Sequence, residues 1–187
     1  MNKLVKKFWE LSRGQQENFI DNIYGFSKDT KDIFSVWLEK DENSGKNTGE
    51  EKVLARLLTS VKKETSNKIG KSRKIKVSNI NTIIKNAKKY PVSNMSIITL
   101  YFEIWTHFLD FLLAVKWVPE RYQKSCGKFI EEYFSELENI LDIEEKKKLQ
   151  KKAIEIIEFS IDINRGNVKS VYLEDVCSSL ETVKSKI

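Results

Sequence analysis

Apolar residues are most concentrated between residues 95 and 118, where the sequence reads MSIITLYFEIWTHFLDFLLAVKWV. Apolar side chains occupy almost every face of the helix that this stretch would form, and its charged residues are Glu103, Asp110 and Lys116. A helix that is hydrophobic nearly all round must be covered on all sides. The pattern therefore predicts a buried central helix over 95–118.

Amphipathic patterns, with apolar residues three and four positions apart, predict further helices on both sides of this stretch. Ser12 with Gln15 fits a capping box, and Ser78, Ser93 or Asn94, and Asp142 are the expected caps of three later helices. Besides the central helix, the expected ranges are a short piece over 3–11 and helices over 13–26, 30–40, 50–68, 78–90, 120–141, 143–163 and 168–185.

The fold expected from these segments is all-α, with about eight helices joined by short connections. Only two Pro and seven Gly interrupt the 187 residues, and no run alternates at period two. We expect a single domain over 1–187 with a flexible loop at 41–49, where the sequence is polar. Its helices would form an antiparallel bundle or a short HEAT-like solenoid around the central helix.

The net charge of +6 permits an acidic partner without requiring one. Basic residues gather between 62 and 89, which makes nucleic-acid or polyanion binding one alternative. Lys outnumbers Arg there, which weakens base-specific recognition, and a run of this kind is commonly a solvated surface. The candidate residues for nucleic-acid binding are Lys68, Lys71, Arg73, Lys74, Lys76, Lys85, Lys88 and Lys89.

Glu103, His107 and Asp110 lie at i, i+4 and i+7 on one face of the central helix. Carboxylate and imidazole groups on adjacent turns are suited to binding a metal or to acid–base chemistry, so a metal-dependent enzyme is a second alternative. The simpler interpretation is a polar seam that is exposed to solvent or satisfies a buried hydrogen bond. No catalytic motif accompanies these residues, and we expect no cofactor.

The same three residues argue against a membrane span. About 20 apolar residues would cross a bilayer, but a charged residue at the centre of a lone spanning helix costs roughly 2.5–3.5 kcal/mol. Cys126 and Cys177 match no metal or redox spacing and are expected to be free thiols. We therefore expect a cytoplasmic protein without a membrane partner.

The four tryptophans, Trp9, Trp37, Trp105 and Trp117, each lie in an apolar helical stripe. Such positions favour packing in the core. For Trp9 and Trp37 a second interpretation stays open, namely an anchor for a partner helix, because Trp is enriched at the centres of protein interfaces.

The chain resembles a bacterial all-helical family known only as a domain of unknown function. Three parts of the sequence carry the resemblance: LSRGQQENFIDNIYGFSKDTKDIFSVWLEKD, the basic KIKVSNINTIIKNAKKY, and the apolar helix with Trp105, His107, Phe108 and Asp110. The resemblance implies a bundled or solenoid-like helical fold, and it implies no activity and no catalytic residue.

The sequence thus favours a non-enzymatic helical module that presents a packed helix surface to a protein partner. Abundant amphipathic helices and few loops to carry chemistry support this expectation. The partner is another protein or a second copy of the chain, with nucleic-acid binding and a metal-dependent enzyme as the two alternatives.

Overall fold

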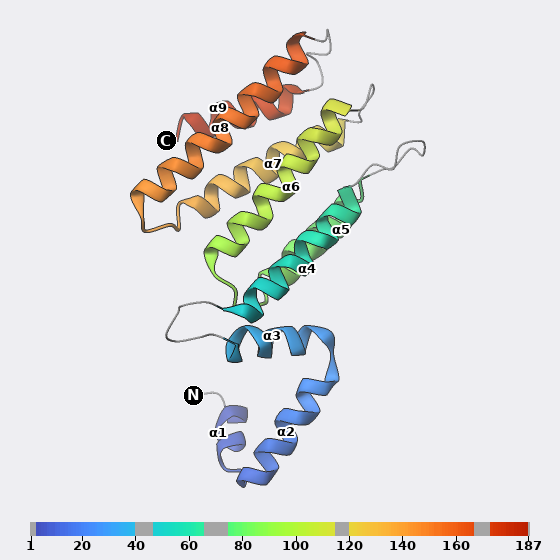
Figure 1. Cartoon of the computed structure of the whole chain (residues 1–187), viewed down its shortest axis with the longest axis vertical. Helices are drawn as coiled ribbons and strands as arrows, with labels where there is room; N and C mark the ends of the chain where they lie inside the picture. Colours follow the sequence, from blue (N-terminus) through green and yellow to red (C-terminus); the bar gives the residue numbers. More distant parts are fainter. Residues whose placement is uncertain (1–2, 40–46, 66–74, 115–119, 167–172, 187) are drawn as a thin grey trace. The chain divides into compact units, whose positions relative to one another are not determined.

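The computed structural model describes residues 3–39, 47–65, 75–114, 120–166 and 173–186, except for the side chains of 3–5 and 164–166. Within these ranges the chain forms nine α-helices and no strand, so the all-α prediction is confirmed (Figure 1). The chain divides into two compact units, Met1–Val53 and Leu54–Ile187, each described by itself below. The single-domain organisation stays a prediction.

The first unit contains α1 (Lys3–Trp9), α2 (Arg13–Phe26), α3 (Lys28–Leu38) and the start of α4 (Thr48–Thr65). The predicted capping box is present, because the backbone N–H of Gln15 donates to Ser12 Oγ and Ser12 N–H donates to Gln15 Oε1 at 3.0 Å. Ser27 is the N-cap of α3, and its side chain accepts from Thr30 N–H at 3.1 Å. Two serines at the helix starts thus set the entry to α2 and α3.

The beginning of α4 is tied to the end of α3 within the first unit. Asn47 Nδ2 donates to the carbonyl of Val36 at 2.7 Å, and Asn47 Oδ1 accepts from Glu50 N–H at 2.9 Å. Gly49 lies so close to the backbone of Ser35 that a Cβ at this position would overlap it. The predicted loop at 41–49 therefore ends earlier than expected, because α4 begins at Thr48. Residues 41–46 lie outside the described part.

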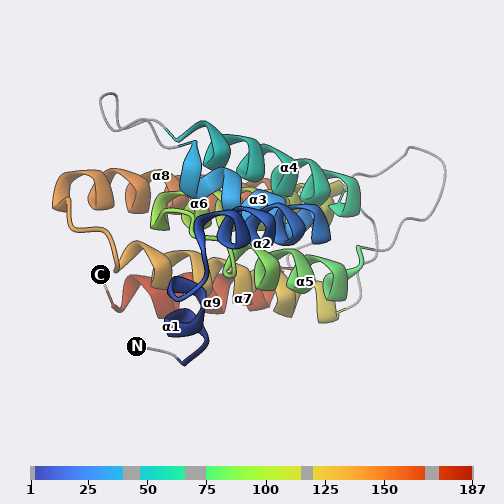
Figure 2. The same cartoon turned by 90° about the horizontal axis from the view of Figure 1, so that it is seen from below.

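The second unit contains the rest of α4 and five further helices in two layers (Figures 1 and 2). One layer holds α4, α6 and α8, and the other holds α5, α7 and α9. Contacts of α7 with α6 and α9 are the most extensive in this unit. It is thus a short stack of helical hairpins. The bounds are α5 Val77–Ala87, α6 Asn94–Ala114, α7 Glu120–Leu137, α8 Ile143–Gly166 and α9 Glu174–Lys184.

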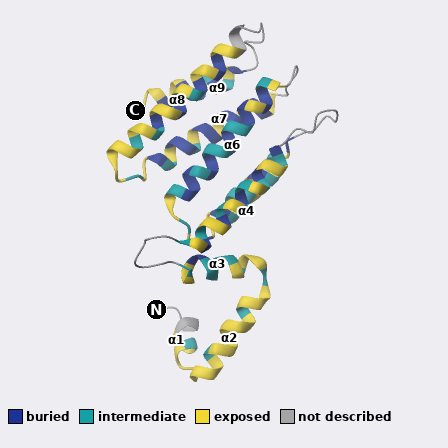
Figure 3. Cartoon of the chain, in the orientation of Figure 1, coloured by how far each residue is buried: buried dark blue, intermediate teal, exposed yellow. Residues whose placement is uncertain are grey.

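Helix α6 is the core of the second unit, as its composition predicts (Figure 3). More than half of its residues are buried, including Trp105 and Phe108, which have no exposed surface. Trp105 and Tyr133 of α7 lie with ring centroids 5.8 Å apart, and Phe108 meets Phe129 at 5.3 Å. Edge-on aromatic pairs of this kind add to the stabilisation from apolar burial. Residues 115–118 of the predicted helix lie outside the described part.

Two predicted caps are present and one is wrong. Ser93 Oγ accepts from Ser96 N–H at 3.3 Å before α6, and Asp142 Oδ1 accepts from Glu144 N–H at 2.9 Å before α8. The predicted cap Ser78 instead lies inside α5, whose N-cap is Lys76 and lacks a side-chain hydrogen bond. The helix predicted over 143–163 is too short at its end, because α8 continues to Gly166.

Gly127 permits the close packing of α7 against α9. A Cβ at this position would lie 2.5 Å from Ser179 Oγ and 3.1 Å from the carbonyl oxygen of Asp175. Real Cβ atoms do not approach other atoms at 2.5 Å, so the two helix backbones come together here because the side chain is a hydrogen atom.

Candidate interaction surface

The first unit exposes many large apolar side chains, most of them aromatic. Figure 3 shows that most of α2 is exposed. Helix α2, whose fourteen residues all lie in the described part of the chain, has no buried residue. Phe26 is 88% exposed, and Trp9 is 65% exposed. We call this set the N-terminal apolar surface; its members are Trp9, Leu11, Phe19, Ile20, Tyr24, Phe26, Trp37 and Leu38.

The members on α2 lie on one side of the helix. At about 100° per residue, positions 19, 20, 23, 24 and 26 fall within an arc of roughly 160°. Contacts within the unit cover this arc only in part: Phe19 meets Phe8 at 5.4 Å, and Tyr24 meets Phe34 at 6.0 Å between ring centroids. An apolar stripe wider than about 100° on a surface helix normally faces a core. These two ring contacts leave much of the stripe uncovered.

Trp37 and Leu38 belong to the last turn of α3, which is held in place on its other side. Val36 is buried, and its carbonyl accepts from Asn47. Glu39 accepts from Lys52 Nζ at 2.8 Å and from Thr48 Oγ1 at 3.1 Å. These two hydrogen bonds, Lys52 first, lower the pKa of the Glu39 carboxyl. The turn is therefore fixed while the Trp37 side chain stays 71% exposed.

The predicted core position of Trp9 and Trp37 is wrong, while that of Trp105 is confirmed. Trp117 lies outside the described residues. Helical spacing shows which side of a helix is apolar, but it does not show whether another element covers that side. Both side chains are exposed, and the second interpretation, an anchor for a partner, stays a prediction.

The candidate metal-binding residues on α6 are brought together only in part. His107 Nε2 lies 3.6 Å from Glu103 Oε2, and both side chains are partly exposed. Asp110 is exposed on the following turn. Across the described ranges, no group of three or more His, Cys, Asp or Glu is placed to hold a metal ion. The Glu103–His107 pair alone supplies two ligands, which is fewer than the three or four protein ligands of ordinary zinc sites.

Half of the candidate nucleic-acid-binding residues, Lys68, Lys71, Arg73 and Lys74, lie outside the described part. Lys76, Lys85, Lys88 and Lys89 are exposed. Lys88 Nζ is bonded to Glu136 at 2.8 Å and lies 5.4 Å from the centroid of the Tyr101 ring. The bond to Glu136 raises the pKa of Lys88 to about 12.

A groove between α5 and α7 brings Lys85 and Lys88 near Lys128, a residue that the sequence did not single out. Acidic side chains accompany these lysines: Glu132 lines the groove and accepts from Tyr101 Oη at 3.4 Å, and Glu136 pairs with Lys88. Because these carboxylates offset the lysines, the groove is mixed in charge and only weakly suited to a phosphate backbone.

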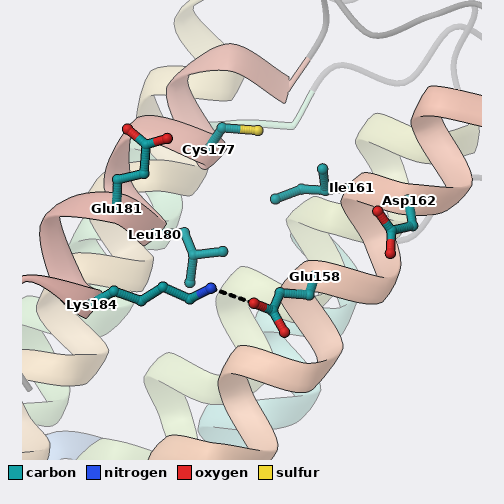
Figure 4. A pocket seen from close by; sticks show the side chains of 7 residues that line it. All are labelled: Glu158, Ile161, Asp162, Cys177, Leu180, Glu181 and Lys184. Atoms are coloured by element: carbon teal, nitrogen blue, oxygen red, sulfur yellow. Dashed lines mark hydrogen bonds and ion pairs between the residues drawn. The ribbon is translucent and has the colours of Figure 1, made fainter.

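A pocket of about 310 Å³ lies between α8 and α9 (Figure 4). An ion pair between Lys184 and Glu158 spans it, and the thiol of Cys177 extends towards Ile161. The remaining lining residues are Asp162, Leu180 and Glu181. The other thiol, Cys126, is buried and donates to the carbonyl of Trp105 at 3.8 Å. Burial raises the pKa of the Cys126 thiol, which makes it a poor nucleophile.

By length and composition, α6 would suffice to cross a membrane. In this structure 56% of its most apolar window is buried. Contacts with α5, α7 and α8 account for that burial. The absence of a membrane partner stays a prediction.

Comparison of the chain with protein-family models, curated proteins and solved structures gives no match. The resemblance to a bacterial helical family is therefore still an expectation.

Proposed function

We propose that this protein is a non-enzymatic helical module that binds another protein chain through the N-terminal apolar surface. The observation that carries the proposal is the exposure of two tryptophans and several further aromatic side chains on α1, α2 and α3. Large apolar patches on a soluble protein mark interaction sites. Trp and Tyr also dominate the energetics of protein interfaces.

The area of the surface supports a specific interface. A buried aromatic side chain contributes roughly 150–250 Å². With the exposed fractions of its eight members, the N-terminal apolar surface offers on the order of 900 Å². A typical stable interface buries about 800 Å² on each partner. The surface is thus large enough without any contribution from α4 to α9.

The charge of the first unit favours a protein partner over a nucleic acid. Residues 1–53 contain nine Lys and Arg against ten Asp and Glu, a net charge of −1. Nucleic-acid binding depends on clustered positive charge and on released counterions. A nearly neutral aromatic surface matches instead the apolar side of an amphipathic helical partner.

The experiment is site-specific photo-cross-linking of the full chain in the cells that produce it. A photoreactive phenylalanine analogue replaces Trp37 in one variant and Phe159 in the control. Phe159 is a matched control because it is an aromatic residue of α8 that is 67% exposed. We expect a discrete protein cross-link from position 37 and none from position 159.

A second-site change makes the result specific to the surface. Phe26→Ser should remove the cross-link from position 37, whereas Leu141→Ser, at a fully exposed position outside the first unit, should leave it unchanged. If position 37 gives no cross-link above the position 159 control, the proposed docking surface is wrong.

A further inference from the structure

We infer that the occupant of the N-terminal apolar surface is a second copy of this chain. The two surfaces would cover each other in a homodimer with twofold symmetry, in which each copy contributes the same residues. This inference rests on the proposed function, because it names the partner of the same surface.

The first argument is that the described side chains of the first unit form almost no buried core. Among them, the buried apolar residues are Val36 on α3 and Val53 on α4, while α2 buries none of its side chains. Short helices are marginally stable in water unless their apolar faces are covered. A surface that completes the fold of the unit has to be covered whenever the chain is folded. A second copy meets this requirement, because it is present wherever the chain is made.

The second argument concerns charge. Residues 1–53 carry a net charge of −1, so residues 54–187 carry +7 to give the chain its +6. Two copies that approach through the remaining surface of residues 54–187 would repel each other, whereas two N-terminal surfaces meet with almost no net charge between them. Electrostatics thus permits self-association through the first unit and opposes it elsewhere.

The third argument concerns the area of the N-terminal apolar surface and the types of residue that form it. Two surfaces of on the order of 900 Å² would bury about 1,800 Å² in total, which lies within the range of stable interfaces. Trp37 stands on a turn that Asn47 already fixes, so little ordering is needed on binding. Trp37 and Phe26 are also the most exposed aromatic residues of the surface, so we expect their burial to contribute most to the dimer.

The experiment is sedimentation equilibrium of the full chain over concentrations from about 1 to 200 µM. We expect a species of twice 21.9 kDa that gives way to the monomer on dilution. Trp37→Ser and Phe26→Ser should each raise the dimer Kd at least tenfold, whereas Trp37→Phe should keep it within about threefold. Phe159→Ser, the exposed control on α8, should leave the Kd unchanged.

A second measurement on the unaltered chain covers the case in which a variant fails to fold. Iodide quenching of tryptophan fluorescence should decrease as the concentration rises through the dimer transition, because Trp9 and Trp37 become covered. Dimerisation should also persist in 1 M NaCl, since an apolar contact is not screened as charge pairs are.

The outcomes separate this inference from the proposed function. A monomer at all concentrations, together with a cross-link from position 37 to another protein, would overturn the second copy as partner and leave the docking surface intact. A dimer that Phe159→Ser disrupts and Trp37→Ser does not would overturn the assignment of the surface itself.

Discussion

Replacing Gly127 with Ala tests the closest helix contact in the second unit. Gly127 lies in the middle of α7 and faces α9. In an isolated helix, Gly→Ala would stabilise by about 1 kcal/mol. Here the added methyl group would lie 2.5 Å from Ser179 Oγ and 3.1 Å from the carbonyl oxygen of Asp175. The first obstacle is a side chain and the second is backbone.

The expected magnitude follows from these two opposing effects. Insertion of a methyl group into a tight contact costs typically 1–3 kcal/mol, and the gain in helix propensity offsets about 1 kcal/mol of it. We therefore expect Gly127→Ala to lower the free energy of unfolding by about 1 kcal/mol. Gly25→Ala serves as the control, because no atom lies within 4 Å of a Cβ there and no loss of stability is expected.

A second substitution, Ser179→Ala, removes the side-chain obstacle, Ser179 Oγ. Ser179→Ala alone loses the hydrogen bond from Ser179 Oγ to Glu131 Oε1 at 2.8 Å, which costs about 0.5–1.5 kcal/mol. In this background Gly127→Ala should be close to neutral, so that the double-mutant cycle gives a coupling energy of at least about 0.5 kcal/mol.

Urea unfolding followed by circular dichroism at 222 nm measures the four free energies of unfolding in this cycle, those of the unaltered chain, the two single variants and the double variant. Additive effects within about 0.3 kcal/mol would show that Ser179 is not the obstacle. A gain of a full kcal/mol from Gly127→Ala in the native background would refute the close approach of α7 and α9.

Three further predictions concern the core and the lysines. Tyr133 Oη is buried without a hydrogen-bond partner among the described residues. Tyr133→Phe should therefore raise the free energy of unfolding by roughly 0.5–1 kcal/mol. A decrease of similar size would show that Tyr133 Oη has a hydrogen-bond partner in the folded protein. Ellman's reagent between pH 7 and 9 should react with Cys177 in the native protein and with Cys126 only after unfolding. Burial raises the pKa of the Cys126 thiol and blocks access to it. Rapid reaction of both thiols in the native protein would contradict this packing. The chain should elute from heparin below about 0.2 M NaCl; stronger retention that Lys85→Glu with Lys128→Glu abolishes would favour the nucleic-acid alternative.

Local patterns in the sequence were sufficient to predict most helices and the positions of several helix ends. The range 13–26 for α2 and the cap at Ser12 depend on neighbouring residues alone, and both are confirmed. The α5 cap failed because Ser78 is a good capping residue by type, yet the backbone already enters the helix at Lys76. Residue type alone therefore leaves the start of a helix uncertain by a few positions when several polar residues precede it.

The candidate sites show the limit of a single sequence more clearly. The i, i+4 spacing correctly placed Glu103 beside His107, but any third ligand would have to come from another helix, and helix packing is not local information. Lys128 was missed for the same reason, since it comes near Lys85 only because α5 and α7 line the same groove. The one signal for Gly127 was a glycine at a mid-helix position, which often marks a close contact.

Helices α6 and α2 both have a wide apolar face in the sequence, but only the face of α6 is buried. Both have apolar arcs wider than a surface helix needs, yet α6 is covered by α7 and other helices, whereas much of the arc on α2 is left to solvent. The difference lies in the neighbours that each helix has within its own unit. Because an uncovered arc of this width is costly in water, its presence on α2 supports the proposed docking surface. That proposal requires the aromatic rings near Trp37 to become protected when a partner binds.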